Sequence, residues 1–567
     1  MTDKFHSSFQ KVLNYYQQGR LEEAEKLCRH ILEENPSYGE ALHWMGFIAA
    51  QSGKTQEAVG WLERASESLP ENPVIHNHLA NAYQRCRRQD EAERHYLLAL
   101  QYKPDYAEAH NNLGGFYDKL NHYEKALEHY AKAVNLQPDY MAAHQNLGVF
   151  FLKNQQYDEA IKQFNNVLQL EPETLTAHYH LGNLYLERGQ LDLAETHYNA
   201  ALSLDPEHEN SLNNLGVVYL KKEVPQLAID YFTRALALNN NNKEAQSNIA
   251  ATFMQYERYE NAARHYRELL RHEPNSLEYH YNIGVAYMAL GHLNEAIVHF
   301  EQVLAQSPEH AATLSNLGAV YWRLNKKKKA EDFFESALKI DPDNTSNRYM
   351  LSAILQKQDY DKAPQFYIQH LFDHYALGYD KHMYGRLDYR VPQEMEKMLK
   401  TYSRPESQWI TLDLGCGTGL LGSVLKPFSN YLIGVDLSEK MLEHAKKTSF
   451  YDVCYQDEIL NFLAHETKCF DCIAAAEVLE YFGDLNRLFS QVSSHLNAQG
   501  WFIFSIEIQE KKAAFFLQAS ARFAHNPSYI QMLAQSHHFN LIASERVKGR
   551  LHEGKPLEEQ VFLLQAF

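Results

Sequence analysis

Cysteine, long apolar runs and positive charge are all scarce in this sequence. Six cysteines among 567 residues are too few for a disulfide framework, which favours a reducing compartment. No apolar run approaches the roughly 18 residues that cross a bilayer, so we expect no membrane span. The first eight residues show no basic-then-apolar signal, and we therefore expect a cytoplasmic protein. Export as an effector by a signal-free route stays open.

The charge balance disfavours one class of partner. Lysine and arginine number 54 against 72 acidic residues, which gives a net charge of -18. Nucleic-acid backbones bind basic surfaces, and the one obvious basic run, 326–329, is short, so we expect no nucleic-acid partner. Cys469 and Cys472 form an isolated C-x-x-C at the start of an apolar run. We interpret this pair as core packing and expect no metal site.

A period of 34 residues organises the sequence up to about residue 344, and the total length requires at least two domains. Proline, alanine, a glycine-or-alanine position and an aromatic each recur at this spacing. Small residues let two helices approach closely, aromatics fill the space between units, and proline ends a helix. The prolines are Pro36, Pro70, Pro104, Pro138, Pro172, Pro206, Pro274, Pro308 and Pro342. The small residues are Gly46, Ala80, Gly114, Gly148, Gly182, Gly216, Ala250, Gly284 and Gly318.

These columns resemble the tetratricopeptide repeat. By that resemblance, residues 5–344 form ten two-helix repeats, and 345–365 form a capping helix and a linker. The fold implied is an all-α superhelix with a long concave groove that binds a protein or peptide.

An asparagine column goes beyond the fold. Asparagine amides both donate and accept hydrogen bonds, so a row of them can pair with an extended peptide backbone. The column resembles the asparagine ladder of the O-GlcNAc transferase repeats, which implies a partner-binding role. The alternative is that the amides connect adjacent helices. The column comprises Asn112, Asn146, Asn214, Asn248, Asn282 and Asn316.

A second pattern begins at Trp409. An apolar run enters the glycine-rich turn 413–419, and a second apolar run ends at Asp436. Glycines let the backbone approach a ligand closely, and an acidic residue about 20 residues further on suits two ribose hydroxyls. The pattern predicts a nucleoside cofactor on an open α/β sheet, without identifying the nucleoside.

Four ordered motifs in 366–567 resemble class I S-adenosylmethionine-dependent methyltransferases: 413–419, 455–457, 470–473 and 500–505. The resemblance implies a Rossmann-like α/β domain and S-adenosyl-L-methionine as the cofactor. The segment 371–384, before the first motif, resembles one in a bacterial family of tetratricopeptide-containing methyltransferases, in which such tyrosine-rich helices close over the cofactor. The cofactor-binding residues it implies are Asp413, Gly415, Gly417, Gly419, Asp436, Leu437, Asp457, Glu477, Tyr375 and Tyr379.

The acceptor side is less defined. Residues that follow the fourth strand face the ligand crevice of an open α/β sheet, so Glu480 and Tyr481 become acid or base candidates. Similarity to the same bacterial family adds His525 as a catalytic candidate, and Tyr529 and Arg550 as acceptor-pocket candidates. We also expect 510–524 to be helical.

We therefore expect a methyltransferase (EC 2.1.1) whose repeats bind a partner or substrate peptide, with transfer to a protein side chain. One alternative is a small-molecule or carbohydrate acceptor, with the repeats as a tether. Another is a non-catalytic adaptor. The sequence leaves open the acceptor atom, the identity of the partner and the oligomeric state.

Overall fold

The computed structural model describes residues 2–376, 379–380, 383, 389–403, 408–510, 513–552 and 555–567. These residues form two compact units, one up to Thr252 and one from Phe253 onward, and each is described by itself. Within the described ranges, no helix is both long and apolar enough to cross a membrane.

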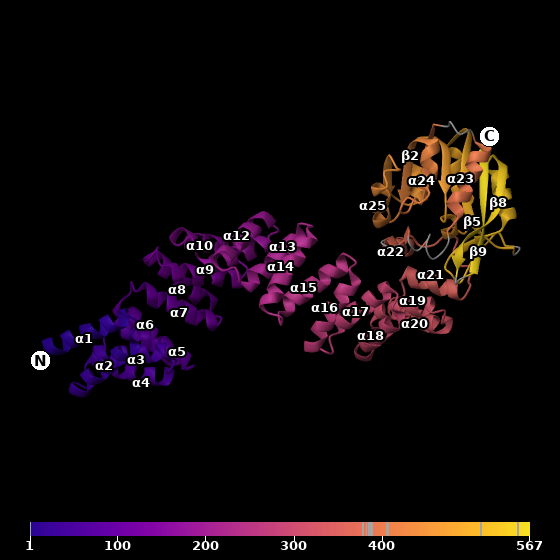
Figure 1. Ribbon diagram of the computed structural model, residues 1–567. Helices are drawn as coiled ribbons and strands as arrows, with labels where there is room; N and C mark the ends of the chain where they lie inside the picture. The colour runs from indigo at the N-terminus through magenta and orange to yellow at the C-terminus, as the bar shows by residue number, and fades with distance from the viewer. Residues whose placement is uncertain are drawn as a thin grey trace. The chain divides into compact units, whose positions relative to one another are not determined.

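The first unit consists of antiparallel helix pairs (indigo to magenta, Figure 1). Each pair occupies one 34-residue period, as the sequence predicts. The helices are α1 (Thr2–Gln17), α2 (Leu21–Glu34), α3 (Gly39–Gln51), α4 (Thr55–Ser68), α5 (Pro73–Arg85), α6 (Gln89–Tyr102), α7 (Ala107–Lys119), α8 (Tyr123–Leu136), α9 (Met141–Lys153), α10 (Tyr157–Leu170), α11 (Leu175–Glu187), α12 (Leu191–Leu204), α13 (Glu209–Lys221) and α14 (Pro225–Leu238).

The small-residue column sits where the two helices of a repeat meet. A Cβ on Gly182 in α11 would lie 2.6 Å from the ring of Tyr198 in α12, closer than atoms can pack. The aromatic column joins neighbouring repeats, since the hydroxyl of Tyr117 donates to Glu93 of the preceding repeat at 2.6 Å. Both packing roles predicted from the period are therefore present.

Histidine pairs recur inside the repeats. In the pair His178–His197 the two Nδ1 atoms lie 3.0 Å apart, and Nε2 of His178 lies 3.0 Å from the carbonyl of Pro172. Because a carbonyl only accepts, His178 donates through Nε2, and its Nδ1 accepts from His197. The bond needs one Nδ1 without a proton, so the pair does not form when both rings are protonated. Equivalent pairs are His76–His95, His110–His129 and His280–His299, and Gln163 replaces the second histidine opposite His144.

The second unit continues with repeat helices and then an α/β domain. The helix α15 (Lys243–Gln255) spans the boundary between the two units. The next helices are α16 (Tyr259–His272), α17 (Leu277–Leu290), α18 (Leu293–Gln306), α19 (Ala311–Arg323), α20 (Lys327–Ile340), the capping helix α21 (Thr345–Ile354), α22 (Gln365–Tyr375) and α23 (Val391–Tyr402).

A nine-stranded sheet follows, in the order β3-β2-β1-β4-β5-β7-β6, with β9 antiparallel to β5 and paired with β8. The strands are β1 (Trp409–Leu414), β2 (Ser429–Asp436), β3 (Val453–Gln456), β4 (Phe470–Ala475), β5 (Leu496–Ile508), β6 (Phe515–Leu517), β7 (Phe523–His525), β8 (Phe539–His552) and β9 (Lys555–Ala566). Between them lie α24 (Gly422–Leu425), η3 (Lys426–Phe428), α25 (Glu439–Lys447), α26 (Ile459–His465), η4 (Leu479–Tyr481), α27 (Asn486–Ser494) and α28 (Pro527–Ser536).

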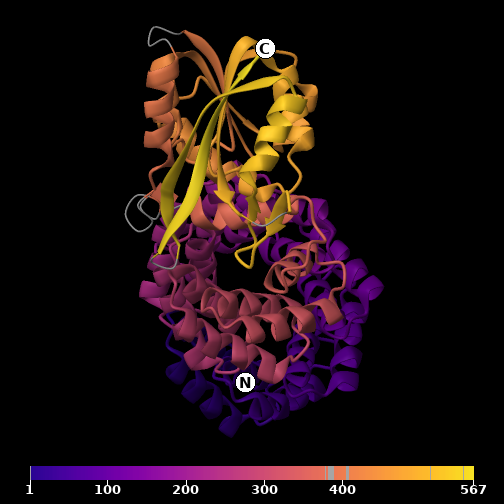
Figure 2. The same ribbon diagram turned by 90° about the vertical axis from the view of Figure 1, so that its right-hand side faces the viewer.

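Helices cover both faces of this sheet (Figure 2). One face packs against α23 and α24, where Met395 and Leu399 meet Ile503 and Leu563. The other face packs against α26, α27 and α28. The domain is therefore a three-layer α/β fold of the Rossmann-like type, as expected.

The expectation of a helix over 510–524 is wrong for the described residues. β7 instead pairs with the far end of β5, through Glu507 and Ala524, and β6 folds back on β7. Ala521 closes this turn with a left-handed φ of 60°, which a helix does not accommodate. Pairing with β5 makes this segment a strand. Helix and strand propensities of the segment alone do not indicate that pairing.

The β6–β7 turn docks on the last repeats. Trp322 of α19 donates to the Ala519 carbonyl at 2.9 Å, and Gln358 accepts from the Leu517 amide at 2.9 Å. The segment after α21 is tied to the loop behind β4 as well, because the Ala363 amide donates to the Tyr481 carbonyl at 2.8 Å. Both loops also contribute to the site described next.

Candidate functional site

A cavity opens at the carboxyl edge of the sheet, beyond the ends of β1, β2 and β4. This is where open α/β sheets bind ligands. Its walls come from the glycine turn, the loops after β2, β3 and β4, and α22. The lining residues are Ile368, Phe372, Tyr379, Gly415, Gly417, Asp436, Leu437, Met441, Asp457, Glu458, Ile459, Ala476, Glu477, Val478, Tyr481 and Phe482.

The glycine turn owes its shape to two positions. Gly415 has φ +68°, and a Cβ there would lie 2.4 Å from Cγ2 of Val478. Gly417 has φ +54°, and a Cβ there would meet no atom within 4 Å. The first glycine therefore permits close packing, and the second leaves its space open to a ligand.

Asp436 anchors this turn from the end of β2. One carboxylate oxygen accepts from the Gly417 amide at 2.9 Å, and the other accepts from the Ser438 amide at 2.9 Å. Burial raises the pKa of Asp436, while the two backbone N–H groups oppose the shift. Asp436 also lines the cavity, and each carboxylate oxygen has two lone pairs, so the group can accept further hydrogen bonds from a ligand.

Two predicted cofactor residues stand outside the lining. The carboxylate of Asp413 accepts from the Tyr451 hydroxyl at 2.7 Å, and burial raises its pKa to about 7. Gly419 faces the ring of Tyr451, where a Cβ would lie 3.2 Å away. These residues support the turn from behind rather than lining the cavity.

The tyrosine-rich segment contributes one wall. Tyr379 lines the cavity together with Ile368 and Phe372 of α22. Tyr375 belongs to α22, but its side chain lies outside the described residues. The structure therefore brings one of the two predicted lid tyrosines to the site.

Of the residues predicted after β4, Glu477 and Tyr481 reach the cavity, and Glu480 lies behind it. Glu477 has a left-handed φ of 57°, which is a strained conformation for glutamate. Its amide donates to the hydroxyl of Ser505 at 3.0 Å. Glu480 is 0% exposed, and its pKa is raised. Burial is the larger cause, and the negative charge of Glu477 adds to it.

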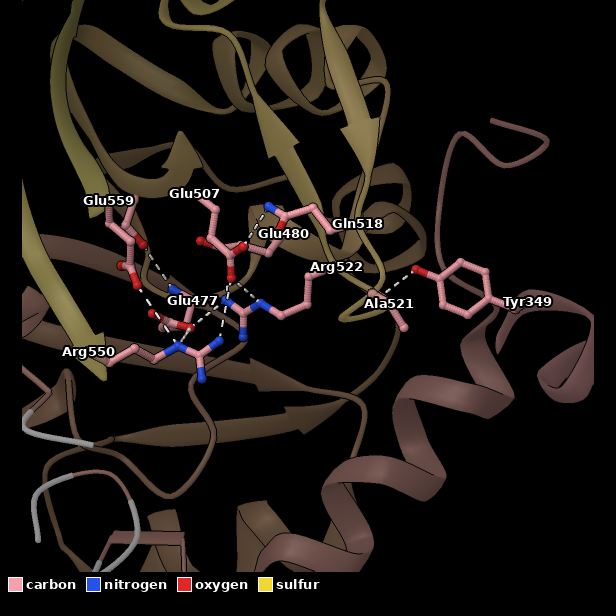
Figure 3. Close-up of polar contacts among 10 residues, drawn as sticks. Tyr349, Glu477, Glu480, Glu507, Gln518, Ala521, Arg522, Arg550 and Glu559 are labelled. Atoms are coloured by element: carbon pink, nitrogen blue, oxygen red, sulfur yellow. Dashed lines mark hydrogen bonds and ion pairs between the residues drawn. The ribbon is translucent and has the colours of Figure 1, made fainter. Parts of the chain in front are cut away.

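Behind the cavity, four glutamates surround two arginines (Figure 3). Arg522 contacts Glu477 at 2.6 Å through Nη2, and Glu507 at 2.5 Å through Nε. Nε of Arg550 lies 3.3 Å from the same Glu477 oxygen. Burial would raise the pKa of Glu477, but the two guanidiniums outweigh it and hold the pKa low.

Sequence reasoning found only part of this cluster. The sequence predicted Glu477, Glu480 and Arg550 as site residues. It did not predict Arg522, Glu507 or Glu559, which lie on β7, β5 and β9 or beside them. An arginine three residues before the candidate His525 was the available signal. The strand pairing that joins these residues is not visible as a local motif.

His525 does not line the cavity. It is fully buried, its Nε2 lies 3.1 Å from the Gly483 carbonyl, and burial lowers its pKa to about 4. The ring stacks beside Tyr529, whose hydroxyl donates to Asp484 at 2.7 Å. Both residues fix the loop after η4, which is a positioning role.

The asparagine column connects consecutive repeats within each unit. Asn112 donates to Asn77 at 3.1 Å, and Asn214 donates to Asn183 at 2.8 Å. An asparagine side chain has two amide N–H groups and one carbonyl. Each of these bonds uses one N–H of the donating asparagine. Equivalent bonds link Asn146 to Asn111, Asn248 to Asn213 and Asn316 to Tyr281, and Asn282 is half-buried at the same position of α17.

Comparison with known proteins gives matches to both parts of the chain. The family described as "Methyltransferase domain" matches residues 412–504. Families described as "Tetratricopeptide repeat" match between residues 15 and 343, for example 15–82, 140–207 and 275–343.

Curated methyltransferases match about a fifth of the chain. A ubiquinone biosynthesis O-methyltransferase of Coxiella burnetii is 29% identical over 118 residues, which is 20% of this chain and 50% of the relative. A probable S-adenosylmethionine-dependent methyltransferase, CRG1, of Saccharomyces cerevisiae is 34% identical over 114 residues, 18% of this chain and 38% of the relative. The chain thus spans about half, or less, of the length of these relatives.

Among solved structures, pilF of Pseudomonas aeruginosa is similar at 23% identity and a TM-score of 0.34, over 37% of this chain and 95% of that one.

The family matches show that the chain is a tetratricopeptide-repeat protein that carries a methyltransferase domain.

Proposed function

We propose that the protein is an S-adenosyl-L-methionine-dependent methyltransferase that modifies a protein side chain delivered by its repeats. One observation carries the cofactor assignment. The backbone of Gly415 and Gly417 and the carboxylates of Asp436 and Asp457 line one cavity at the carboxyl edge of the sheet.

The cavity residues fit this cofactor. Asp436 would accept the ribose hydroxyls, Asp457 would accept from the adenine amino group, and the open side of Gly417 would admit the methionine part. When bound, the cofactor supplies a methyl group on a sulfonium that is already an activated leaving group. Phe372 and Tyr379 would exclude water from the cavity.

The acceptor side falls to the residues after β4. Tyr481 borders the cavity, and Glu480 lies buried behind it with a raised pKa, so it can take up a proton near neutral pH. In-line alignment of the acceptor supplies much of the rate, since the leaving group needs little further activation.

Partner binding is assigned to the asparagine column. Asn112 and Asn214 each bond to the neighbouring repeat through the amide NH2 group, and the second N–H of each amide suits a carbonyl of an extended peptide backbone. A small-molecule acceptor is the second candidate, because the printed names of several curated relatives describe ubiquinone biosynthesis O-methyltransferases.

The cofactor assignment is tested by calorimetric titration of the full chain with S-adenosylhomocysteine. Asp436→Ala should abolish the binding, and Asp343→Ala, a fully exposed aspartate of the repeats, should preserve it. Absence of binding by the wild type, or unchanged binding by Asp436→Ala, would refute the assignment.

The acceptor class is tested with radiolabelled S-adenosylmethionine on an array of immobilised random peptides. The double variant Asn214→Ala/Asn248→Ala should lose peptide labelling, and Asn199→Ala, an exposed asparagine on a second helix, should retain it. Peptide labelling that survives the double variant would refute the role of the column. Labelling of small molecules alone would favour the second candidate.

A further inference from the structure

Three glutamates behind the cofactor cavity converge from separate elements. Glu477 follows β4, Glu480 lies in η4 and Glu559 lies in β9 (Figure 3). One carboxylate oxygen from each lies within 4.8 Å of the others. Their side chains are 6%, 0% and 0% exposed. We call this group the three-glutamate cluster.

Several oxygens of the cluster lack hydrogen-bond partners within the described part of the chain. They are both oxygens of Glu480, both of Glu559 and Oε1 of Glu477. A buried carboxylate without a partner costs several kcal/mol, so a native structure normally compensates it. A proton shared by Glu477 and Glu559 would satisfy part of the set, and Glu480 would still lack a partner.

The neighbouring arginines lie closer to Glu477 and Glu507 than to Glu480 and Glu559. Arg522 and Arg550 both contact Oε2 of Glu477 and Oε1 of Glu507. Glu480 and Glu559 each lie 3.9 Å from the nearest guanidinium nitrogen. Four carboxyl groups therefore face two guanidiniums (Figure 3), so two positive charges would be needed to balance the group with every carboxyl ionised.

We propose that the three-glutamate cluster binds one divalent cation of the oxygen-preferring class, such as Mg²⁺, Mn²⁺ or Ca²⁺. The donors are carboxylate oxygens alone, which these ions prefer, whereas zinc sites usually include imidazole or thiolate. Glu477 would use Oε1 for the cation and Oε2 for the arginines. A bound dication would balance the four carboxyls in their ionised form and would give the unpartnered oxygens a ligand.

The inference extends the proposed function, because Glu477 also lines the proposed cofactor cavity. It revises the expectation from sequence that the chain holds no metal. Glu477 and Glu480 are close in sequence, but Glu559 joins them only through the antiparallel pairing of β9 with β5. No local spacing reveals a site of this kind.

The test is a titration of the full chain with Mn²⁺ alone, after treatment with EDTA and dialysis, followed by electron paramagnetic resonance. One Mn²⁺ per chain should bind and should be displaced by Mg²⁺ or Ca²⁺. Glu480→Gln and Glu559→Gln should each weaken binding by about 10- to 100-fold. Glu396→Gln, on an exposed ion pair of α23, is the matched control and should bind normally.

Two results would overturn the proposal: a wild-type protein that retains no Mn²⁺, or a Glu480→Gln variant that binds it as the wild type does. Circular dichroism of each variant verifies folding, and the wild-type titration holds even if a variant does not fold. A parallel titration with S-adenosylhomocysteine separates the two hypotheses. Cofactor binding without Mn²⁺ binding would leave the proposed function intact and refute the cation site.

Discussion

The hydroxyl of Tyr349 donates a hydrogen bond of 2.9 Å to the carbonyl of Ala521, and both residues are buried. Tyr349 lies in the capping helix α21, and the residue after Ala521 is Arg522, which contacts Glu477 in the cavity wall. A short path therefore connects the last repeats to the candidate site (Figure 3).

Removing this hydroxyl should weaken the docking of the β6–β7 turn. Tyr349→Phe would leave a buried carbonyl without its donor, which costs about 1–3 kcal/mol. We expect a lower urea midpoint for the catalytic domain. Tyr402→Phe, which changes a tyrosine that is 46% exposed, should leave the midpoint unchanged. Equal midpoints for both variants would show that the contact contributes nothing.

Arg522→Gln should be far more damaging than a surface arginine change. It leaves Glu477 and Glu507 buried with less compensation, and breaking a buried pair in this way costs about 3–5 kcal/mol. Arg546→Gln, whose pair with Glu510 is exposed, should cost less than about 1 kcal/mol. Thermal unfolding of the two variants, with the affinity for S-adenosylhomocysteine, measures the difference.

Two glycines with nearly the same backbone angle should respond differently to alanine. Gly415 (φ +68°) would place its Cβ against Val478, and Gly189 (φ +70°) would meet nothing within 4 Å. Gly189→Ala should cost about 1 kcal/mol from backbone strain alone. Gly415→Ala adds steric overlap and should also abolish binding of S-adenosylhomocysteine. Normal binding by Gly415→Ala would contradict the geometry of the turn.

The histidine pairs predict loss of repeat stability in acid. Burial and the partner ring lower the pKa of His95, His129 and His197 to about 4, against about 6.5 for an unfolded chain. The unfolded chain therefore binds more protons below pH 6.5, and stability falls from there toward pH 4. Urea midpoints at pH 7.5 and pH 5 measure the loss.

The chain supplies its own control for this prediction, because Gln163 replaces the second histidine in one repeat. The triple variant His95→Gln/His129→Gln/His197→Gln should show a smaller drop between pH 7.5 and pH 5. An unchanged drop would locate the acid sensitivity elsewhere.

The fold was largely predictable because its signals are local and periodic. Gly182 and Tyr117 belong to columns of small and aromatic residues that recur every 34 residues. Each repeat therefore gives independent support for the same two-helix unit. The turn around Gly415 and the acidic end of β2 at Asp436 are also short-range patterns. These residues converge on one cavity, with Asp413 and Gly419 behind it rather than in its lining.

Three residues of the charged cluster could not be predicted, because long-range strand pairing brings them together. Arg522, Glu507 and Glu559 meet through pairing between β5, β7 and β9, and such pairing depends on the whole sheet. The helix expected over 510–524 failed at the same place. The residues around Ala521 carry no local pattern that indicates the pairing of β7 with β5.

The docking of the β6–β7 turn has a consequence for how this chain can be divided. A catalytic fragment that begins at residue 366 would lose Trp322, Tyr349 and Gln358, which bond to the backbone of that turn. It would also lose Ala363, which bonds to the loop after β4. We therefore expect a fragment that begins at residue 366 to be less stable than a fragment that also contains these residues of the last repeats.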